Sequence, residues 1–457
     1  MENKPCIREG QMKEPRRPRK ACRGKRSGGS TMYSDALQVL RQRGHIEWCS
    51  NDDDLGALFR REMVTAYVGF DPTADSLHVG HLIPIMALAW IQRCGHRPIP
   101  LAGMGTGLIG DPSGKSKERN LLTIEKVKEN LEGVKKQLAS FLDFRCGPNS
   151  ALLINNYDWL GKLTFLEVLR DVGKHFSVNS MISREYVRSR LEDPEKSISY
   201  TEFSYVLLQA YDFLHLFSNY GCRLQMGGND QQGNIISGVD LIRKKTGGEA
   251  FGATQPLLLT SSGTKFGKTE EGAVWLDPAR TSPYKFYQFW MNVEDQSVEK
   301  LLKLFTFLSL DEIAEIMNLH EKSPERREAQ RRLAWEVTTI VHGAESAETV
   351  KKASSILFGE SFEPRELSGE MLRTLSAEVP TGESLREFPL PLVDLLMSAG
   401  ACPSKSEARR LIKGGGLYVN GERVSDENRS VKEEDVLGER YLFVRLGKKR
   451  FFMILFR

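Results

Sequence analysis

Two patterns of apolar and polar positions follow one another along the chain. Between residue 65 and about residue 260, short apolar runs typical of β strands alternate with longer stretches that repeat with the period of a helix. The predicted strands lie at 65–70, 97–103, 151–156 and 222–228, and the predicted helices at 82–95, 123–142 and 200–217. Strands that alternate with helices predict an α/β domain with a mostly parallel sheet.

The pattern changes after Pro283, where strand-like runs give way to consecutive helical stretches. These stretches predict an α-helical domain over 283–357. A polar stretch rich in glycine and proline predicts a linker over 358–387. From 388 to 457, two helical stretches precede three short β runs, which predicts a small α+β domain. The α/β domain would then occupy 32–282.

Residues 1–31 form a leader that is rich in arginine and lysine and poor in large apolar residues. It has no apolar core, so it is not a secretory signal. Its abundant arginine would suit a transit peptide to an organelle, although Glu2, Glu9 and Glu14 oppose this, since such peptides avoid acidic residues. Otherwise the leader is a disordered basic tail, or Met32 is the true start. We expect a cytoplasmic protein, with the mitochondrion or another organelle as the alternative.

Composition narrows the class of protein only a little. Hydrophobic residues make up 40% of the 457 residues, which is typical of a globular protein, and no apolar run approaches the roughly 20 residues of a membrane span. The net charge of +4 permits an acidic partner such as RNA without requiring one. Seven scattered cysteines without a Cys-x-x-Cys pair argue against a disulfide scaffold and a structural zinc site.

The segment DPTADSLHVGH at 71–81 directly follows a predicted strand and opens a predicted helix. The N-terminus of a helix offers free N–H groups and a positive dipole end to a phosphate. His78 and His81 lie one helical turn apart and face the same way, so they could bond to phosphate oxygens. The alternatives are a zinc pair or two surface histidines, but no nearby cysteine or histidine supplies the remaining zinc ligands.

The segment KFGKT at 265–269 lies in a glycine-rich loop. Lys265 and Lys268 are flexible point charges that could stabilise negative charge as it develops on a leaving pyrophosphate. On its own, such a loop is more often a solvated turn.

Two other glycine-rich segments imitate nucleotide-binding motifs. Residues 105–110 match a dinucleotide fingerprint, but Asp111-Pro112 follows at once, which predicts a loop where the fingerprint needs a helix. Residues 110–116 are one residue short of a phosphate-binding loop. We therefore expect neither kind of site.

Taken together, the histidine and lysine segments resemble the two signature motifs of the class I aminoacyl-tRNA synthetases. The surrounding residues resemble the tyrosyl-tRNA synthetase family of bacterial or organellar type. The matching segments are YVGFDPTADSLHVGH (67–81), TGLIGDPSGK (106–115), NNYDWLG (155–161), VLRDVGKHFSVN (168–179), TEFSYVLLQAYDF (201–213) and KFGKT. The C-terminal segment 389–424 resembles an S4-type RNA-binding domain.

This resemblance implies a Rossmann-like catalytic domain over 32–282 that includes the KFGKT loop. It implies that the helical domain binds the anticodon arm of a tRNA and that 388–457 is an S4-like RNA-binding domain. It also implies a homodimer.

The resemblance assigns roles to the residues of a tyrosine site. Selection of tyrosine over phenylalanine requires hydrogen bonds to the phenol hydroxyl, a rule for which this family is the standard example. Tyr67 and Asp212 would make these bonds. Tyr205, Gln209 and Asp212 are spaced by four and three residues on one predicted helix, so they share one face. The residues assigned to the ammonium and carboxylate groups of tyrosine are Tyr205, Gln209, Asp111 and Gln231.

The resemblance also implies a reaction in two steps. The tyrosine carboxylate attacks the α-phosphorus of ATP and expels pyrophosphate, and the terminal hydroxyl of tRNA(Tyr) then attacks the adenylate. Mg²⁺ would accompany ATP, held mainly by phosphate oxygens, and we expect no tightly bound cofactor and no metal ligands in the protein. The residues assigned to ATP are Gly69, Asp71, His78, His81, Asp230 and Lys268. The residues assigned to catalysis, chiefly around the leaving pyrophosphate, are Thr73, His78, His81, Lys115, Arg119, Lys265, Lys268 and Thr269.

In the S4-like domain, basic side chains could form one helix face for the RNA backbone, although a solvated charged face is the alternative. They are Lys405, Arg409, Arg410 and Lys413. One departure from the family is Gln232, where the family usually has tryptophan. Two other functions stay open: an RNA-binding protein that has lost catalysis, and a tryptophanyl enzyme, which should lack the paired phenol readers.

Overall fold

The computed structural model describes residues 33–113, 122–193, 197–259, 263, 266–269, 272–357, 367–447 and 450–457. Of Glu185, Tyr186, Lys268 and Thr269 it describes only the backbone. The chain divides into two compact units. The first unit holds the described residues up to Asp75 together with Ile83–Leu257, and the second holds Ser76–Leu82 together with Leu258–Arg457. No helix in the described ranges is long and apolar enough to cross a membrane.

The first unit is built on a six-stranded sheet with the strand order β1-β6-β5-β2-β3-β4. Its strands are β1 (Trp48–Cys49), β2 (Thr65–Phe70), β3 (Arg97–Ala102), β4 (Ile154–Asn155), β5 (Cys222–Gly228) and β6 (Phe251–Gln255). All neighbours are parallel except β1, which runs antiparallel to β6. The predicted α/β fold with a mostly parallel sheet is confirmed. Because the chain leaves β2 towards β3 on one side and returns to β5 on the other, a crevice is expected at their carboxyl ends.

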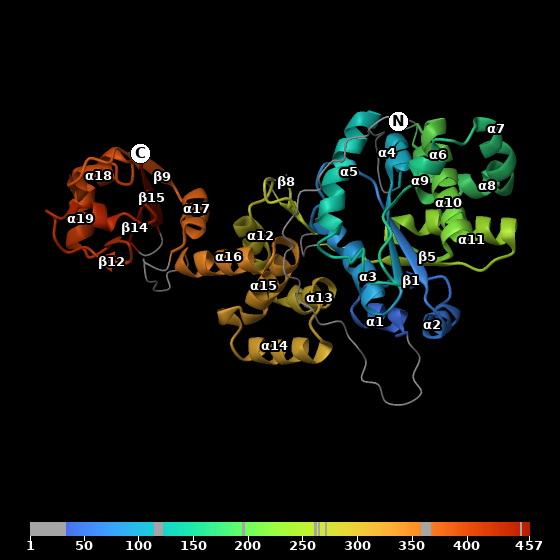
Figure 1. Cartoon of the computed structure of the whole chain (residues 1–457), viewed down its shortest axis with the longest axis horizontal. Coiled ribbons are helices and arrows are strands. Elements are labelled where there is room, and N and C mark those ends of the chain that lie inside the picture. Colours follow the sequence, from blue (N-terminus) through green and yellow to red (C-terminus); the bar gives the residue numbers. More distant parts are fainter. Residues whose placement is uncertain are drawn as a thin grey trace, which may run out of the picture. The chain divides into compact units, whose positions relative to one another are not determined.

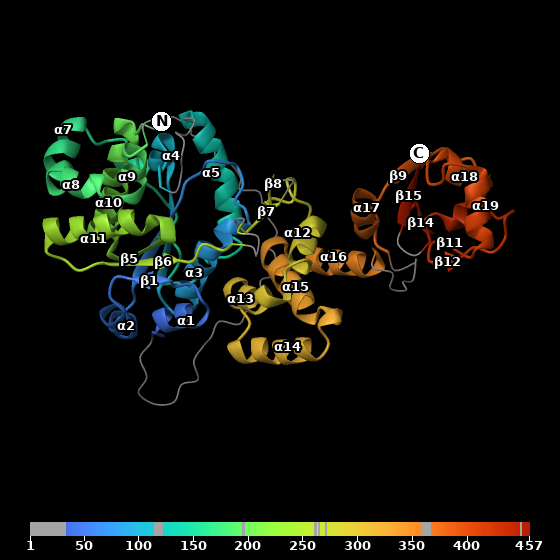
Figure 2. The ribbon, with the colours of Figure 1, turned by 180° about the vertical axis from the view of Figure 1, so that it is seen from behind.

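Helices cover both faces of this sheet (Figures 1 and 2). The longer ones are α1 (Ala36–Gln42), α2 (Asp52–Arg61), α3 (Leu82–Arg93), α5 (Ile124–Leu138), α10 (Tyr200–Tyr220) and α11 (Gln232–Thr246). The shorter ones are α4 (Met104–Ile109), α6 (Tyr157–Leu160), α7 (Phe165–Glu167), η2 (Val168–Val172), η3 (Gly173–His175), α8 (Val178–Ile182), α9 (Glu185–Leu191) and η4 (Asn229–Gln231). Burial on both faces explains why the strands read as apolar runs without alternation.

Helix α10 carries Tyr205, Gln209 and Asp212, three residues with predicted roles, and its ends are well defined. Ser199 caps its N-terminus by accepting the N–H of Glu202, whose carboxylate bonds back to the Ser199 N–H. The helix ends at Gly221, which has a φ of 61°, a conformation that glycine adopts without strain.

The prediction that 105–110 is a loop is wrong. Met104–Ile109 form the short helix α4, which ends at Gly110. Packing at Gly105 is tight, because a Cβ there would lie 3.0 Å from Leu160 Cδ1 and 3.2 Å from Asn156 Oδ1.

Besides Ser76–Leu82, the second unit contains an antiparallel pair of short strands, β7 (Lys268–Thr269) and β8 (Gly272–Ala273). Its helical region contains α12 (Pro283–Met291), α13 (Asp295–Phe305), α14 (Leu310–Lys322), η5 (Pro324–Arg326), α15 (Glu328–His342) and α16 (Ala344–Leu357). Three of these helices were read from the sequence, whereas α12 and α16 were not singled out.

The C-terminal part of the second unit is a mixed α+β fold. Its helices are α17 (Gly369–Glu378), α18 (Leu392–Ser398), α19 (Lys405–Lys413) and η7 (Glu433–Asp435). Its strands are β9 (Thr381–Ser384), β10 (Leu390–Pro391), β11 (Leu417–Val419), β12 (Glu422–Arg423), β13 (Ser430–Val431), β14 (Tyr441–Leu446) and β15 (Arg450–Phe456). Five of them form a sheet in the order β12-β11-β14-β15-β9.

The predicted linker over 358–387 is wrong where the structure describes it as α17 and β9. Strand β9 pairs in parallel with β15 and so belongs to the C-terminal sheet. Glycine at 382 is required by close packing, because a Cβ there would lie 1.9 Å from the carbonyl oxygen of Ala399. A glycine that serves packing looks the same in sequence as a glycine that gives flexibility. Residues 358–366 lie outside the described part.

Candidate active site

Tyr67 lies on β2 at the centre of the first unit's sheet, paired with Ile99 of β3 and Gln225 of β5. Its side chain is buried, with its ring 5.4 Å from the ring of Phe213. Burial, and then the negative charge of Asp212, raise the pKa of the Tyr67 phenol well above its ordinary value. The Tyr67 hydroxyl makes no hydrogen bond to any residue that the structure describes. It is therefore a buried polar group that can still form a hydrogen bond with a ligand.

Asp212 is buried on α10, and its carboxylate is held on both oxygens. Asn156 Nδ2 donates to Oδ2 over 2.8 Å, and Trp159 Nε1 donates to Oδ1 over 2.7 Å. Burial raises the pKa of Asp212 to about 7, although these two hydrogen bonds oppose the shift. The two residues expected to read a phenol therefore lie in one buried site. Asn156 and Trp159 were not assigned a role from the sequence, although both belong to the NNYDWLG segment.

Asn156 links Asp212 to a second carboxylate. Its Nδ2 also donates to Thr106 Oγ1 over 3.0 Å, and that hydroxyl donates to Asp71 Oδ1 over 2.9 Å. The Asn156 Oδ1 accepts the N–H of Gly105 over 2.6 Å. Asn156 thus links Asp212, in the middle of α10, through Thr106 to Asp71, just beyond β2. Thr106 is a further residue that sequence reasoning missed.

Tyr205 lies one turn before Gln209 on α10 and is buried. Burial, and then the charges of Asp71, Asp111 and Asp212, raise the pKa of its phenol well above the ordinary value. The effect of the Asp212 charge on Tyr205 is consistent with the prediction that Tyr205, Gln209 and Asp212 share one face of α10.

The amide groups of Gln209 and Gln231 extend the polar network towards Asp111. Gln209 Nε2 donates to Gln231 Oε1 over 3.2 Å, and Gln231 Nε2 donates to Asp111 Oδ2 over 2.7 Å. Burial raises the pKa of Asp111, while its bonds from Ser113 and Gln231 lower it. Asn234, which the sequence did not single out, donates to Ser113 Oγ over 3.2 Å and to Gln209 Oε1 over 3.1 Å.

At the carboxyl end of β2 the chain opens to solvent. Gly69 is exposed, and a Cβ there would meet no atom within 4 Å. Asp71 follows in a turn closed by the N–H of Thr73, whose side chain is exposed. Asp230 follows β5 in the 3₁₀ turn η4 and accepts from Gln231 Nε2 over 3.1 Å. The candidates for nucleotide contact in the first unit thus lie just beyond two neighbouring strands.

The second unit contains the histidine segment. His78 precedes the 3₁₀ turn η1 (Val79–His81), and the two imidazole rings lie 4.0 Å apart. The N–H of His78 donates to His81 Nδ1 and the N–H of Gly80 donates to His78 Nδ1, both over 3.1 Å. Since each Nδ1 is an acceptor, a neutral ring carries its proton on Nε2. Burial, and then His78, lower the pKa of His81 to about 3.

The lysine loop pairs with the histidine segment through the backbone. The N–H of Val79 donates to the carbonyl of Val274, and the N–H of Val274 donates to the carbonyl of Gly267, both over 2.9 Å. Gly267 has a φ of 86°, and a Cβ there would lie 3.1 Å from Val79 Cβ. The two signature segments, far apart in sequence, are therefore adjacent within the second unit.

Several predicted residues of the phosphate site cannot be placed. Lys115, Arg119 and Lys265 lie outside the described residues. Lys268 and Thr269 form β7, of which only the backbone is described. On α19, Lys405 pairs with Asp394 over 2.7 Å and Lys413 pairs with Glu427 over 3.2 Å. Arg409 and Arg410 are exposed and make no ion pair with a described residue.

Comparison with known proteins gives this arrangement a class. Residues 60–359 match the family model of class I tRNA synthetases for tryptophan and tyrosine, and residues 371–454 match the model of the SYY-like C-terminal domain of tyrosine–tRNA ligases. The chain therefore belongs to the class I tRNA synthetases.

The relatives narrow the class further. The chain is 50% identical over 422 residues to the tyrosine–tRNA ligase of Roseiflexus castenholzii, covering 92% of this chain and 98% of that one. It is 48% identical over 429 residues to the ligase of Geobacillus stearothermophilus, covering 92% and 99%. A C-terminally truncated mitochondrial tyrosyl-tRNA synthetase of Aspergillus nidulans shares 36% identity and a TM-score of 0.66, over 73% of this chain and 95% of that one. Within its class the chain belongs to the tyrosine–tRNA ligases, as its motifs predicted.

Proposed function

We propose that the chain selects L-tyrosine through the buried pair Tyr67 and Asp212, activates it with ATP and transfers it to the 3′ end of tRNA(Tyr). The observation that carries this proposal is the Tyr67 hydroxyl, which is buried without a described partner beside Asp212. A substrate phenol donates to the carboxylate of Asp212 and accepts from the hydroxyl of Tyr67. A buried group left unpaired costs about 1–3 kcal/mol; phenylalanine would leave the Tyr67 hydroxyl unpaired and would give Asp212 no hydrogen bond beyond those from Asn156 and Trp159.

The amide and carboxylate network supplies the other end of the tyrosine site. Asp111 carries negative charge when ionised and suits the α-ammonium group, together with Tyr205 and the Gln209 amide oxygen. The Gln231 amide then lies near the substrate carboxylate, and Asp230 beyond β5 takes the ribose. The exposed strand end at Gly69 and Asp71 leaves room for the nucleotide.

The first step needs positioned charge and no covalent bond to the protein. The Nε2–H groups of His78 and His81 suit phosphate oxygens, because each Nδ1 is already occupied by a backbone N–H. The residues proposed to contact the γ-phosphate and the departing pyrophosphate are Thr73, His78, Lys115, Arg119, Lys265, Lys268 and Thr269. Mg²⁺ accompanies ATP and is held mainly by phosphate oxygens.

The second step requires the chain to bind tRNA. We assign tRNA binding to the helical region, α12–α16, and to the exposed basic face of α19 in an S4-like domain. Arg409 and Arg410 are the strongest candidates for phosphate contact, because their charges are not neutralised by a described acidic residue. The division into catalytic, helical and RNA-binding domains is part of this proposal.

A homodimer is also proposed. Large apolar side chains are exposed on α7 and at the start of α10, with Leu166 77%, Phe165 64% and Tyr200 63% exposed. Phe165 and Leu166 are neighbours in the chain, and contiguous exposed apolar side chains, unlike single ones, mark association surfaces. Leu166→Asp should convert a dimer to a monomer in sedimentation analysis, and an unchanged mass would contradict this surface.

The compartment is proposed to be the cytoplasm, with an organelle as the alternative. Fusion of residues 1–31 to a fluorescent protein decides between them. Diffuse fluorescence supports the cytoplasm, and organellar import supports a transit peptide.

ATP–pyrophosphate exchange across all amino acids tests the proposal as a whole. Exchange that depends on tyrosine alone is the expected result. Exchange with tryptophan alone would mean that Tyr67 and Asp212 do not read a phenol. No exchange by well-folded protein that still binds tRNA would favour an RNA-binding module without catalysis.

A further inference from the structure

The second residue of the KFGKT segment points into an aromatic cluster of the helical region. The ring of Phe266 lies 5.1 Å from Phe289, 5.7 Å from Trp290 and 6.2 Å from Phe305, to which it is nearly parallel at 10°. Trp290 and Phe305 are buried and lie 5.2 Å from one another. Aromatic rings at these separations attract each other in offset or edge-to-face geometry.

Gly267, the third residue of the segment, packs against Val79, which lies between the two histidines in the sequence. Gly267 approaches Val79 so closely that a Cβ would fit only with a shift, and its carbonyl accepts from Val274, which in turn pairs with Val79. The next residue, Lys268, begins β7. The Phe266-Gly267 dipeptide is therefore held between the histidine segment and the helices, one residue before the lysine proposed to meet the pyrophosphate.

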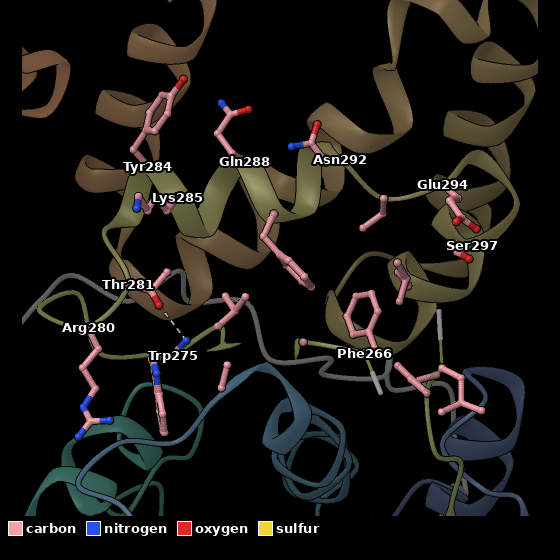
Figure 3. A pocket seen from close by; sticks show the side chains of 18 of the residues that line it. Phe266, Trp275, Arg280, Thr281, Tyr284, Lys285, Gln288, Asn292, Glu294 and Ser297 are labelled. Carbon is pink, nitrogen blue, oxygen red and sulfur yellow. Dashed lines mark hydrogen bonds between the residues drawn. The ribbon is translucent and has the colours of Figure 1, made fainter. Parts of the chain in front are cut away.

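Phe266 is partly buried. It lines a cavity of about 820 Å³ together with Trp275, Phe289, Asn292 and Ser297, among others. Figure 3 shows the Phe266 ring below α12, while Gln288 and Asn292 lie on the opposite side of that helix. Among the described residues, the aromatic cluster supplies the ring contacts of Phe266.

We propose that Phe266 is a positioning residue for tyrosine activation, which sets the place of the Lys268 strand by anchoring it on Phe289, Trp290 and Phe305. The ring touches no reacting atom in this proposal and acts through the backbone that it holds. It follows that the helical region, which we assign to tRNA, is in direct ring contact with the loop of the first chemical step. The inference rests on the proposed role of Lys268.

The test measures tyrosine-dependent pyrophosphate exchange by the full-length chain. Phe266→Ala should lower kcat by up to about 10²-fold, because a misplacement of about 1 Å is enough for such a loss, while KM for tyrosine stays unchanged. Phe266→Tyr keeps the ring and should restore most of the rate, and Phe266→Leu should fall between. A folded Phe266→Ala protein with the rate of the unmodified chain would overturn the proposal.

Two variants on the helical side sharpen the test. Phe289→Ala removes a ring partner of Phe266 and should slow exchange; combined with Phe266→Ala it should add little, because both remove one contact. Phe286→Leu is the matched control, since Phe286 lies on the same helix and 6.0 Å from Trp290 but packs on His342. It should lower the melting temperature without slowing exchange. Equal slowing by Phe286→Leu would overturn the proposal in favour of general packing.

The role of Lys268 is checked separately. If Lys268→Ala slows exchange and Phe266→Ala does not, the positioning proposal alone fails. If Lys268→Ala leaves the rate unchanged, the role proposed for the loop itself fails.

Discussion

The residues proposed to bind tyrosine lie in the first unit and are called the tyrosine side, while the histidine segment and the KFGKT loop lie in the second unit and are called the phosphate side. The two are built by different means. On the tyrosine side, buried side chains hold one another: Asn156 and Trp159 fix Asp212 by direct hydrogen bonds. On the phosphate side, backbone hydrogen bonds link Val79 to Val274 and Val274 to Gly267. A neutral phenol has to be read by desolvated, immobile partners, whereas a triphosphate can be met by flexible charges in water.

Burial shifts a pKa on each side, upwards for a carboxyl group on the tyrosine side and downwards for an imidazole on the phosphate side. It raises the pKa of the Asp212 carboxyl to about 7 and lowers that of the His81 imidazole to about 3. In each case the neutral form is favoured, because low polarity penalises charge of either sign. The consequence differs, since the phenol is best bound by ionised Asp212, while the neutral His81 ring still donates from Nε2.

The largest effect is expected from a change that breaks the phosphate side alone. Lys268→Ala should lower kcat for tyrosine activation by about 10²–10³-fold, the usual loss when one group that stabilises developing charge is removed. The dissociation constant for tyrosine should be unchanged, because no residue of the tyrosine site is altered. Pre-steady-state adenylate formation and equilibrium dialysis measure the two quantities.

Lys322→Ala provides the control for charge. Lys322 is an exposed lysine at the end of α14 in the same unit and does not line the cavity beside the loop, so its loss removes one positive charge away from the loop. Its rate should match that of the unmodified chain. A large loss of tyrosine affinity in Lys268→Ala would show that this lysine has been misplaced.

The converse change breaks the tyrosine side alone. Tyr67→Phe should reduce discrimination between tyrosine and phenylalanine by about tenfold, since one hydrogen bond is worth about 0.5–1.5 kcal/mol. The ratio of kcat/KM for the two amino acids measures it. Because the hydroxyl has no described partner in the protein, the free energy of unfolding should stay the same or rise. A clear loss of stability would mean that the hydroxyl is bonded within the protein.

The two sides also differ in how far sequence could predict them. Strands β2 and β5 end where the apolar runs TAYVGF and CRLQMGG end, so residues following them, such as Asp71 and Asp230, could be placed at one edge of the sheet. Asn156 and Trp159 could not be assigned, because their bonds to Asp212 cross more than fifty positions in the chain. Such contacts depend on packing, which periodicity does not contain.

The phosphate side shows the opposite limit. Its lysines and histidines were predicted from motif spacing, but the pairing of Val79 with Val274 and of Val274 with Gly267 could not be predicted from either segment alone. Likewise, α17 and β9 were mistaken for a linker because glycine at 382 serves close packing. Local composition shows which residue types a segment contains, but the contacts that those residues make depend on the fold.

A pH titration sharpens the comparison. With a pKa of about 7 for Asp212, tyrosine affinity should rise about tenfold from pH 6 to pH 8 as the carboxyl ionises and gains a charge-assisted hydrogen bond. His81, with its pKa near 3, does not titrate in this range, so the change belongs to the tyrosine side. Asp212→Asn should flatten the curve; a curve that keeps its slope would point to Asp111, whose pKa is also raised by burial.

The free energy of unfolding should also depend on the ionisation of Asp212, but it should fall with rising pH where tyrosine affinity rises. The folded pKa of Asp212, about 7, lies above its ordinary value of 3.8, so the free energy of unfolding falls as pH rises through this window. Bound tyrosine pairs with the ionised form and offsets the loss. The rise in melting temperature produced by saturating tyrosine should therefore be greater at pH 8 than at pH 6.

The smallest effect is expected from α19, which should leave both sides of the active site intact. Arg409→Ala and Arg410→Ala should each reduce the slope of log affinity for tRNA against log salt by about 1, since one phosphate contact is lost. Lys405→Ala should do less, because Lys405 already pairs with Asp394 and would have to leave it to reach RNA. Pyrophosphate exchange without tRNA should be unchanged in all three variants. If Lys405→Ala weakened tRNA binding more than either arginine variant, the Lys405–Asp394 ion pair would have to open when tRNA binds. The exposed charges of Arg409 and Arg410 would then not be the main RNA contacts of α19.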